Sequence, residues 1–266
     1  MANIFEKNKT YLGDCLELMP QMESGMFDMI LCDLPYGTTA CKWDEIIPFE
    51  PLWREYERLI KPNGAIVLTA SQPFTSALVM SNPKMFRYEW IYSKTKGTGF
   101  LNANKMPMKQ HENILVFYKK LPTYNPIEVF VGIKDKRKTF NPAKLKENNI
   151  YNFKNGGTKN TVYHKKDNGW QMPKSIIHFK NGGKMIHPTQ KPLELFEYLI
   201  KTYTNENELI LDNCAGSGTT GEACFNTGRN YIQIEKEQKY FDLILEREKS
   251  FNKKDLYDGT LFETQM

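Results

Sequence analysis

The chain has 266 residues, 40% of them hydrophobic and 25% charged, which is typical of one large α/β domain or of a core domain with a smaller insert. No apolar run approaches the ~18 residues needed to cross a bilayer, and the N-terminus lacks a signal-peptide core, so we expect a cytoplasmic protein. The five cysteines and four histidines are scattered and form no Cys-x-x-Cys pair, which favours free thiols over a structural zinc site.

Charge is distributed unevenly along the chain, whose net charge is +5. Residues 119–186 hold 15 Lys and Arg against four Asp and Glu, whereas the other residues hold 21 against 27. Aromatic residues alternate with the lysines of this basic segment, a pattern suited to phosphate contact and base stacking. A solvated lysine-rich insert would have the same charge, so charge alone leaves both interpretations open.

In chain order, short β-type runs alternate with helical patterns, which predicts βαβ units and a mostly parallel sheet. The predicted strands cover residues 9–13, 28–32, 65–70, 88–92, 114–118, 208–212 and 231–234. The predicted helices cover residues 15–22, 49–60, 73–80, 192–203, 219–227 and 240–251. Other features expected from the sequence are a turn at 61–64, a mobile loop at 94–109, turns at Asn155-Gly156 and Asn181-Gly182, and a poorly ordered tail after 252.

The first chemical signal is the run Asp33-Leu34-Pro35-Tyr36, which follows the second predicted strand. A buried strand would deliver an acid, a rigid proline and an aromatic ring to one exposed loop. Such groups can hold a planar amino-bearing base and direct its exocyclic nitrogen at an electrophile. Because four residues match by chance in many chains, this interpretation depends on the rest of the sequence.

The second signal is the glycine-rich run from Leu209 to Gly221, in which a strand enters a bend that opens a helix. Glu235 ends the next predicted strand, where a carboxylate can accept hydrogen bonds from both hydroxyls of a ribose. Gly216, Gly218 and Gly221 also satisfy the dinucleotide fingerprint, so a nucleotide-dependent oxidoreductase is a rival hypothesis. Only one strand and one helix follow this loop, which weakens the rival. A tight turn that binds no ligand is a further alternative.

Together these motifs resemble the amino-group DNA methyltransferases of the permuted β class, which use S-adenosylmethionine. Gly13-Asp14-Cys15-Leu16-Glu17 is similar to the segment whose acid meets the cofactor's adenine. His187-Pro188-Thr189-Gln190-Lys191-Pro192 is similar to the segment that contacts its methionine end. Leu34 departs from the commonest family motif, which has proline there. His111 with Glu112 also resembles a family segment, although a structural role at a strand start explains the pair equally well.

The resemblance implies a fold of the α/β class: a three-layer Rossmann-like methyltransferase fold, circularly permuted, with a seven-stranded mixed sheet and one antiparallel strand. It divides the chain into a catalytic half at 1–118, a basic target-recognition insert at 119–186, a cofactor-binding half at 187–252 and a C-terminal tail at 253–266. In the unpermuted fold the last helix leads into the first strand. We therefore expect Phe251 and Lys9 to lie close together.

The resemblance also implies the residues of the site. The implied catalytic residues are Asp33, Leu34, Pro35 and Tyr36. The implied cofactor-binding residues are Asp14, Cys15, Asp33, His187, Thr189, Lys191, Asp212, Asn213, Cys214, Ala215, Gly216, Gly218, Thr219 and Glu235. No metal is expected.

The implied reaction is methyl transfer from S-adenosylmethionine to the N6 amino group of a flipped-out adenine in double-stranded DNA, in a prokaryotic cell or a phage-infected host. The family tends to place Ser first in the motif for cytosine N4 and Asp for adenine, so Asp33 favours adenine and leaves cytosine N4 as the alternative. Methylation at cytosine carbon-5 is disfavoured, because the chain has no Pro-Cys pair. A nucleic-acid-binding protein without activity is the non-enzyme alternative. The recognition sequence, a homodimer and a partner restriction endonuclease stay open.

Overall fold

The structure, a computed structural model, describes residues 4–38, 44–130, 170–179 and 190–258. The turns predicted at Asn155-Gly156 and Asn181-Gly182 lie outside these residues. The chain forms two compact units: Met1–Asn125 together with Lys174–Met266, and the smaller unit Pro126–Pro173. In the smaller unit, β6 (Val129–Phe130) pairs antiparallel with β7 (Trp170–Gln171).

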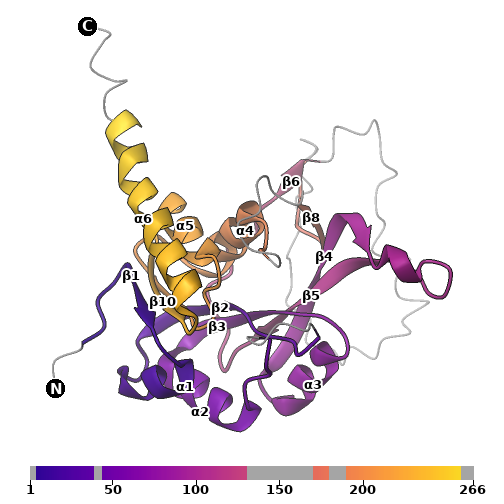
Figure 1. The fold of residues 1–266 in the computed structure, drawn as a ribbon, viewed down its shortest axis with the longest axis horizontal. Helices are drawn as coiled ribbons and strands as arrows, with labels where there is room; N and C mark the ends of the chain where they lie inside the picture. Colours follow the sequence, from indigo (N-terminus) through magenta and orange to yellow (C-terminus); the bar gives the residue numbers. More distant parts are fainter. Residues whose placement is uncertain (1–3, 39–43, 131–169, 180–189, 259–266) are drawn as a thin grey trace, which may run out of the picture. The chain divides into compact units, whose positions relative to one another are not determined.

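An eight-stranded mixed sheet forms the centre of the larger unit (Figure 1). Its strands are β1 (Lys9–Leu12), β2 (Phe27–Asp33), β3 (Ile60–Ala70), β4 (Phe86–Thr98), β5 (Lys109–Phe117), β8 (Ile176–Phe179), β9 (Leu209–Asp212) and β10 (Asn230–Glu235). Their order across the sheet is β1-β10-β9-β2-β3-β5-β4-β8. Only β5 runs antiparallel to its neighbours in this sheet, which confirms the prediction of a single antiparallel strand.

Helices cover both faces of the sheet and complete three layers (Figure 1). The helical elements are α1 (Cys15–Leu18), η1 (Met19–Gln21), α2 (Phe49–Leu59), α3 (Phe74–Ser81), η2 (Phe100–Asn102), α4 (Leu193–Tyr203), α5 (Thr219–Asn226) and α6 (Gln238–Asp258). In Figure 1, α1, α2 and α3 lie below the sheet, whereas α4, α5 and α6 lie above it. Among the described residues, none of the helices is long and apolar enough to span a membrane.

The central strand β2 shows why these layers form. Its residues from Met29 to Cys32 are fully buried, because helices cover both faces of the strand. Met29 and Leu31 pack in the core between the sheet and α4. Ile30 and Cys32 pack in the core on the opposite face, between the sheet and the helices α1 and α2. This alternation follows from the two-residue period of a strand that lies inside the sheet of the larger unit.

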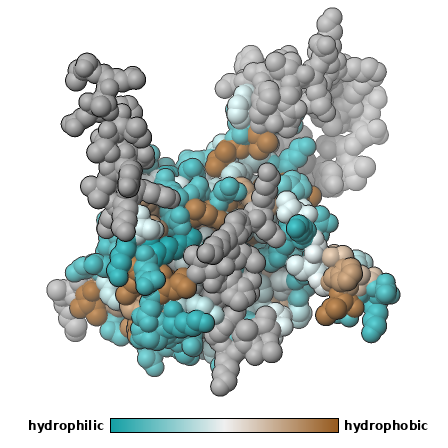
Figure 2. Space-filling model, turned by 45° about the horizontal axis from the view of Figure 1, so that its top comes forward, coloured by the Kyte–Doolittle hydropathy of each residue, from teal (hydrophilic) through white to brown (hydrophobic). Residues whose placement is uncertain are grey.

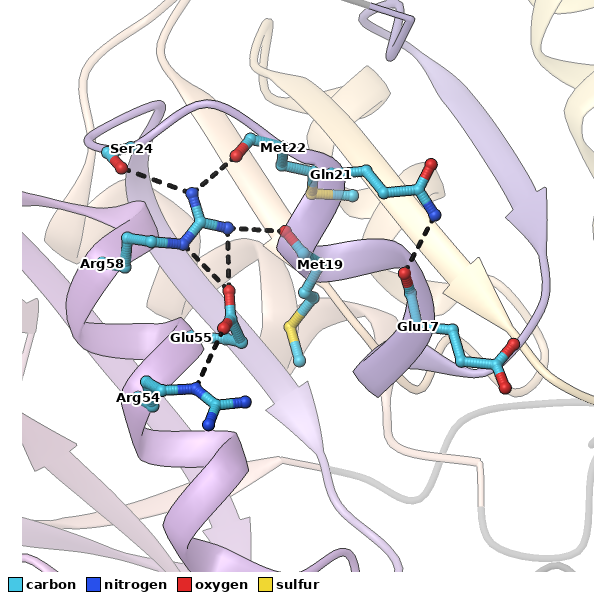
Figure 3. A network of polar contacts seen from close by, with 8 residues as sticks. All are labelled: Glu17, Met19, Gln21, Met22, Ser24, Arg54, Glu55 and Arg58. Carbon is cyan, nitrogen blue, oxygen red and sulfur yellow. Dashed lines mark hydrogen bonds and ion pairs between the residues drawn. The ribbon is translucent and has the colours of Figure 1, made fainter.

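A polar network ties α2 to the segment around η1 (Figure 3). The Arg58 guanidinium donates to the backbone carbonyls of Met19 at 2.7 Å and Met22 at 2.6 Å, and it lies 2.8 Å from Glu55 Oε2. Arg54 lies 3.4 Å from Glu55 Oε1 but is 70% exposed. Arg58 therefore both satisfies two carbonyls and compensates a buried carboxylate.

The first strand and the last helix of the core lie side by side. The Thr10 hydroxyl donates to Glu248 Oε1 at 2.7 Å, and β1 pairs in parallel with β10, the strand before α6. This geometry confirms the predicted proximity of Lys9 and Phe251. The circular permutation from which we predicted it stays a prediction.

The seven predicted strands and six predicted helices all occur, with differences at their ends. The predicted count of seven strands was wrong. The eighth strand, β8, comes from the predicted insert and pairs in parallel with β4, so that β8 forms the edge of the sheet, with its residue Ile177 buried. The smaller unit, Pro126–Pro173, is therefore narrower than the predicted insert at 119–186. The functional division of the chain stays a prediction.

Three boundaries also differ from the predictions. Strands β4 and β5 extend into the predicted loop at 94–109, because the two runs pair as a hairpin as far as Thr98 and Lys109. The turn predicted at 61–64 lies inside β3, where the partners of β2 shift from Ile60 to Ala65. Helix α6 continues to Asp258, well into the predicted tail, since the sequence has no helix breaker before Gly259.

Candidate active site

A cavity of about 410 Å³ opens at the carboxyl ends of β2, β9 and β10. Asp33, Asp212 and Glu235 are the last residues of these strands, and all three line the cavity. Parallel strands end at the same edge of a sheet, so acids far apart in the sequence meet here. The volume falls in the range of small-molecule sites, ~300–1,000 Å³.

Three side chains hold the Asp33 carboxylate. Its Oδ1 accepts from the hydroxyls of Tyr36, at 2.7 Å, and Thr69, while its Oδ2 accepts from Lys191 Nζ at 2.6 Å. The Tyr36 hydroxyl also lies 3.0 Å from Thr69 Oγ1. An ionised carboxylate offers about four lone-pair sites, so these three donors leave one for a further donor. The Asp33 side chain is 23% exposed and lines the cavity, from which that donor can approach.

Lys191 lies between two carboxylates. Its Nζ is 2.6 Å from Asp33 Oδ2 and 3.3 Å from Glu112 Oε2, and Lys94 pairs with the other oxygen of Glu112. Burial acts to lower the pKa of Lys191, but the charges of Asp33 and Glu112 raise it well above its ordinary value. Burial acts to raise the pKa of Glu112, yet Lys191 and Lys94 lower it. Both groups are therefore charged at neutral pH, and Glu112 helps to hold the Lys191 ammonium that contacts Asp33.

The ring of Tyr36 is held in place as firmly as its hydroxyl. It stacks on Phe74 with 5.3 Å between ring centroids, and Lys191 Nζ lies 5.5 Å from the ring centre. Burial, together with the charge of Asp33, raises the pKa of Tyr36 well above its ordinary value. The hydroxyl consequently stays protonated and acts as a hydrogen-bond donor to Asp33.

Asp44 shapes the loop that follows the catalytic motif. Its Oδ1 accepts from the backbone amides of Tyr36, at 2.8 Å, and Gly37, at 2.9 Å, and its Oδ2 accepts from that of Thr38 at 2.9 Å. Gly37 adopts a φ of +66°, and a Cβ there would lie 2.9 Å from Ile46 Cγ1. One carboxylate and one glycine thus determine the backbone path at the mouth of the cavity.

Asp212 and Glu235 hold the glycine-rich loop. Asp212 accepts from the backbone amide of Cys214 at 3.1 Å and from the hydroxyl of Thr220, and Glu235 Oε2 accepts from the amide of Gly216 at 2.7 Å. Burial raises the pKa of Asp212 to about 6. Burial also raises the pKa of Glu235, against the lowering effect of its backbone donors. These two acids therefore shape the loop before any ligand arrives.

Three cysteine thiols, those of Cys15, Cys32 and Cys214, lie near one another at this loop. Cys15 and Cys214 line the cavity, and a hydrogen bond between them lowers the pKa of Cys15 and raises that of Cys214. Burial raises the pKa of Cys32, which is fully buried, to about 12. These cysteines and Cys224 are free thiols, as predicted, while Cys41 lies outside the described residues.

The structure brings most of the predicted site residues to this one cavity. The predicted residues that line it are Asp14, Cys15, Asp33, Leu34, Pro35, Tyr36, Lys191, Asp212, Asn213, Cys214, Ala215, Gly216, Thr219 and Glu235. Gly218 does not line it: a Cβ there would lie 3.1 Å from Ile244, and its φ of +74° starts α5. Its predicted contact with the cofactor stays a prediction. His187 and Thr189 lie outside the described residues.

Two residues that hold the Asp33–Tyr36 loop, Thr69 and Asp44, were not predicted from the sequence. Thr69 is the register partner of Asp33 in the parallel pair of β2 and β3, so the predicted strand ends could have revealed it. Asp44 belongs to no motif, and its contact with Tyr36 depends on the path of the loop between them. No sequence signal marks it.

Residues 27–246 match the family model of the DNA methylases. The chain belongs to the N6/N4 DNA methylase family. The match covers the catalytic motif, Asp33–Tyr36, and the glycine-rich loop up to Glu235. It confirms the family that these motifs predicted.

The methylase is also similar to bacterial type II methyltransferases. It is 28% identical to M1.MboII of Moraxella bovis over 254 residues, which cover 89% of this chain and 95% of that protein. It is 26% identical to M.HpaI of Haemophilus parainfluenzae over 262 residues, 92% of this chain and 76% of that protein. It is 24% identical to the DNA adenine methyltransferase YhdJ of Escherichia coli (strain K12), with coverage of 88% and 80%.

Solved structures share the fold of the methylase. The M1.HpyAVI–SAM complex matches with a TM-score of 0.59 and 24% identity, over 90% of this chain and 98% of that chain. The cytosine-N4-specific PvuII DNA methyltransferase matches with a TM-score of 0.64 and 14% identity, over 95% and 92%. These matches confirm the predicted α/β methyltransferase fold.

Proposed function

We propose that the methylase transfers a methyl group from S-adenosylmethionine to the N6 amino group of an adenine flipped out of double-stranded DNA. The observation that carries this proposal is Asp33, a carboxylate at the end of β2 that keeps one acceptor site toward the cavity. Membership of the N6/N4 DNA methylase family supports an exocyclic amino group of DNA as the target. The similarity to a DNA adenine methyltransferase supports adenine.

The cavity fits S-adenosylmethionine in size and in the chemistry of its walls. Its volume of about 410 Å³ suits a nucleoside with an amino-acid tail, and the carboxylates along it complement hydroxyl and ammonium groups. Glu235 would accept hydrogen bonds from the ribose, while Asp14 and Cys15 would line the adenine end. Lys191 would face the methionine end. The solved complex of M1.HpyAVI with SAM supports S-adenosylmethionine as the cofactor.

Asp33 and Leu34 act on the amino group of the target base. Its nitrogen is a poor nucleophile, because the lone pair is delocalised into the ring. The Asp33 carboxylate and the Leu34 backbone carbonyl accept hydrogen bonds from this group, favour its pyramidal form and stabilise its growing positive charge. S-adenosylmethionine, when bound, supplies a methyl group that the sulfonium charge has already activated. Asp33 or water then accepts the proton of the amino group.

The surrounding side chains position these groups. Lys191 and Thr69 orient the Asp33 carboxylate, so that it need not reorganise during the reaction. Tyr36 stacks on the target base, and Phe74 supports the ring from behind. The reaction is a direct transfer and uses no covalent enzyme intermediate.

The duplex must release the target base before any of these contacts form, at a cost of a few kcal/mol. The lysines of the basic segment, residues 119–186, offset this cost by phosphate contacts. A homodimer and a partner restriction endonuclease are further proposals, and they rest on the resemblance alone.

A cytosine-N4 methyltransferase is the second candidate. The fold match to the PvuII enzyme, which is cytosine-N4-specific, favours it, and the chemistry at the amino group is nearly the same. A nucleotide-dependent oxidoreductase loses its support, because the glycine-rich loop falls inside the DNA methylase match.

The variant Asp33→Ala tests the proposal. We expect methyl transfer to fall by roughly 10³-fold or more, since both positioning and charge stabilisation are lost. S-adenosylhomocysteine should still bind in a calorimeter with micromolar affinity, and NAD should give no heat. Asp242→Asn, a change at an exposed residue of α6, is the matched control. Near-normal turnover of Asp33→Ala would contradict the role, and binding of NAD would favour the oxidoreductase.

A further inference from the structure

The loop that joins β4 to β5 forms the tip of a hairpin, and this tip exposes four large apolar side chains to solvent. Phe100 is 77% exposed and Leu101 is 96% exposed, and Met106 and Met108 expose 58% and 41% of their surfaces beside them. The hairpin projects at the right of Figure 1, and a brown patch marks the same side of the space-filling view in Figure 2. Exposed apolar groups gathered at one place indicate an interaction site.

Backbone hydrogen bonds order the tip of the hairpin. Gly99, at a φ of +90°, starts the short helix η2, and the amides of Asn102 and Ala103 donate to the carbonyls of Gly99 and Phe100, both at 3.0 Å. The amide of Met106 then donates to the carbonyl of Asn102 at 3.0 Å. These bonds hold Phe100 and Leu101 outward, so little conformational entropy is lost when the tip meets a partner.

A chain of ion pairs connects the hairpin to the Asp33 carboxylate. Lys94, near the middle of β4, pairs with Glu112, which pairs with Lys191, the partner of Asp33. From Lys94 β4 continues for four residues to Thr98, roughly 13 Å further at about 3.3 Å per residue. The reach is comparable with the width of a DNA groove, ~12 Å.

The positive charge of the hairpin indicates that its binding partner is a polyanion. Residues 93–110 include Lys94, Lys96, Lys105 and Lys109 and no Asp or Glu. The last three of these lysines are exposed, and no ion pair joins them to any residue that the structure describes. A second copy of this chain would bring a hairpin of the same charge, which repels. DNA is complementary to it.

We propose that Phe100 and Leu101 form a wedge that enters the DNA duplex next to the target base while the hairpin lysines contact the flanking phosphates. This inference rests on the proposed function. Apolar side chains that enter between base steps unstack them, and an aromatic ring replaces part of the lost stacking. The wedge thereby lowers the cost of keeping the target base in the catalytic cavity. It does not touch the reacting atoms, so its contribution is confined to opening the duplex.

The double variant Phe100→Ala, Leu101→Ala tests the wedge. Labelled cofactor and mixed-sequence DNA first locate the site that the wild-type enzyme methylates. Two duplexes of that sequence are then compared, one fully paired and one with an abasic position opposite the target. We expect kcat/KM on the paired duplex to fall roughly 10- to 100-fold, and the abasic duplex to restore most of the loss, because its target base is already unpaired. Phe100→Trp keeps a ring and should stay near wild type.

Matched measurements separate the outcomes. Met80→Ala, at an exposed methionine of α3, controls for the loss of apolar surface, and calorimetry with S-adenosylhomocysteine verifies that the double variant is folded. An equal loss on both duplexes, or no loss on either, overturns the wedge and leaves the proposed function intact. A fall in the sedimentation coefficient of the double variant overturns it in favour of contact between copies. If the wild-type enzyme methylates no DNA, the proposed function fails, and the wedge with it.

Discussion

The hydroxyl of Thr69 contacts two groups of the catalytic loop at once. It donates to Asp33 Oδ1, and the Tyr36 hydroxyl lies 3.0 Å from it, at a position that is almost fully buried. A hydrogen bond to a charged group is worth about 1.5–3 kcal/mol, more than one between neutral groups. Thr69 is therefore a positioning residue, one that sets the direction of the carboxylate without reaching the substrate.

Two substitutions at Thr69 distinguish the effect of its hydroxyl group from the effect of its side-chain volume. Thr69→Val keeps the shape and removes the donor, so we expect kcat to fall roughly tenfold and the free energy of unfolding to fall by about 1–2 kcal/mol. The dissociation constant of S-adenosylhomocysteine should change little. Thr69→Ser restores the hydroxyl and should recover most of kcat in a single-turnover assay. Equal rates for Thr69→Val and the wild-type enzyme would remove Thr69 from the site.

Asp212 makes the stability of the fold depend on pH. Burial raises its pKa to about 6 in the folded protein, against ~3.9 in the unfolded chain. The folded state thus binds this proton more tightly, and the free energy of unfolding falls as the pH rises from about 4 to about 6, by about 2–3 kcal/mol. Asp212→Asn removes the titration. In urea unfolding, its stability relative to the wild type should rise over this window and level off above it, and a change of the opposite sign would contradict the assignment.

At the scale of elements, Arg58 connects α2 to the chain around η1. This chain directly follows residues 13–16, which line the cavity, so the contact supports that wall. The guanidinium meets two backbone carbonyls and Glu55, whose side chain is only 6% exposed (Figure 3). A buried carboxylate that loses its partner is costly, whereas an exposed pair contributes little.

Two arginines on the same helix test this difference. Arg58→Ala should lower the free energy of unfolding by about 2–3 kcal/mol, because Glu55 stays buried without its main partner. Arg54 contacts the same Glu55 but is 70% exposed, so Arg54→Ala should cost about 0.5 kcal/mol or less. Denaturant unfolding measures both. Similar losses for the two variants would mean that the network contributes nothing beyond surface charge.

The elements also show what the sequence could predict and what it could not. Runs such as Met29–Cys32 are apolar enough to identify a buried strand, and a strand end fixes where Asp33, Asp212 and Glu235 lie. Strand β8 escaped prediction because a four-residue edge strand in a lysine-rich segment has no distinctive period. Asp44 shows the same limit at a single residue, because it acts through a loop path that no local pattern encodes.

At the scale of the whole molecule, charge and chemistry occupy different parts of the sequence. The acids and the cavity belong to the larger unit, while residues 119–186 carry 15 Lys and Arg against only four Asp and Glu. Thr10 and Glu248 bring the two ends of the core together, which is the geometry that a permuted order requires. The residues of the cavity and the main excess of basic residues therefore come from different stretches of the sequence.

The identity of the methylated base tests the central claim most directly. The wild-type protein is incubated with mixed-sequence double-stranded DNA and methyl-labelled S-adenosylmethionine, and the DNA is digested to nucleosides for mass spectrometry. With Asp33 at the head of the catalytic motif, we expect the label in N6-methyladenine, and none in the Asp33→Ala variant. Label found solely in N4-methylcytosine would contradict the proposed target base, and unlabelled DNA would contradict the proposed function.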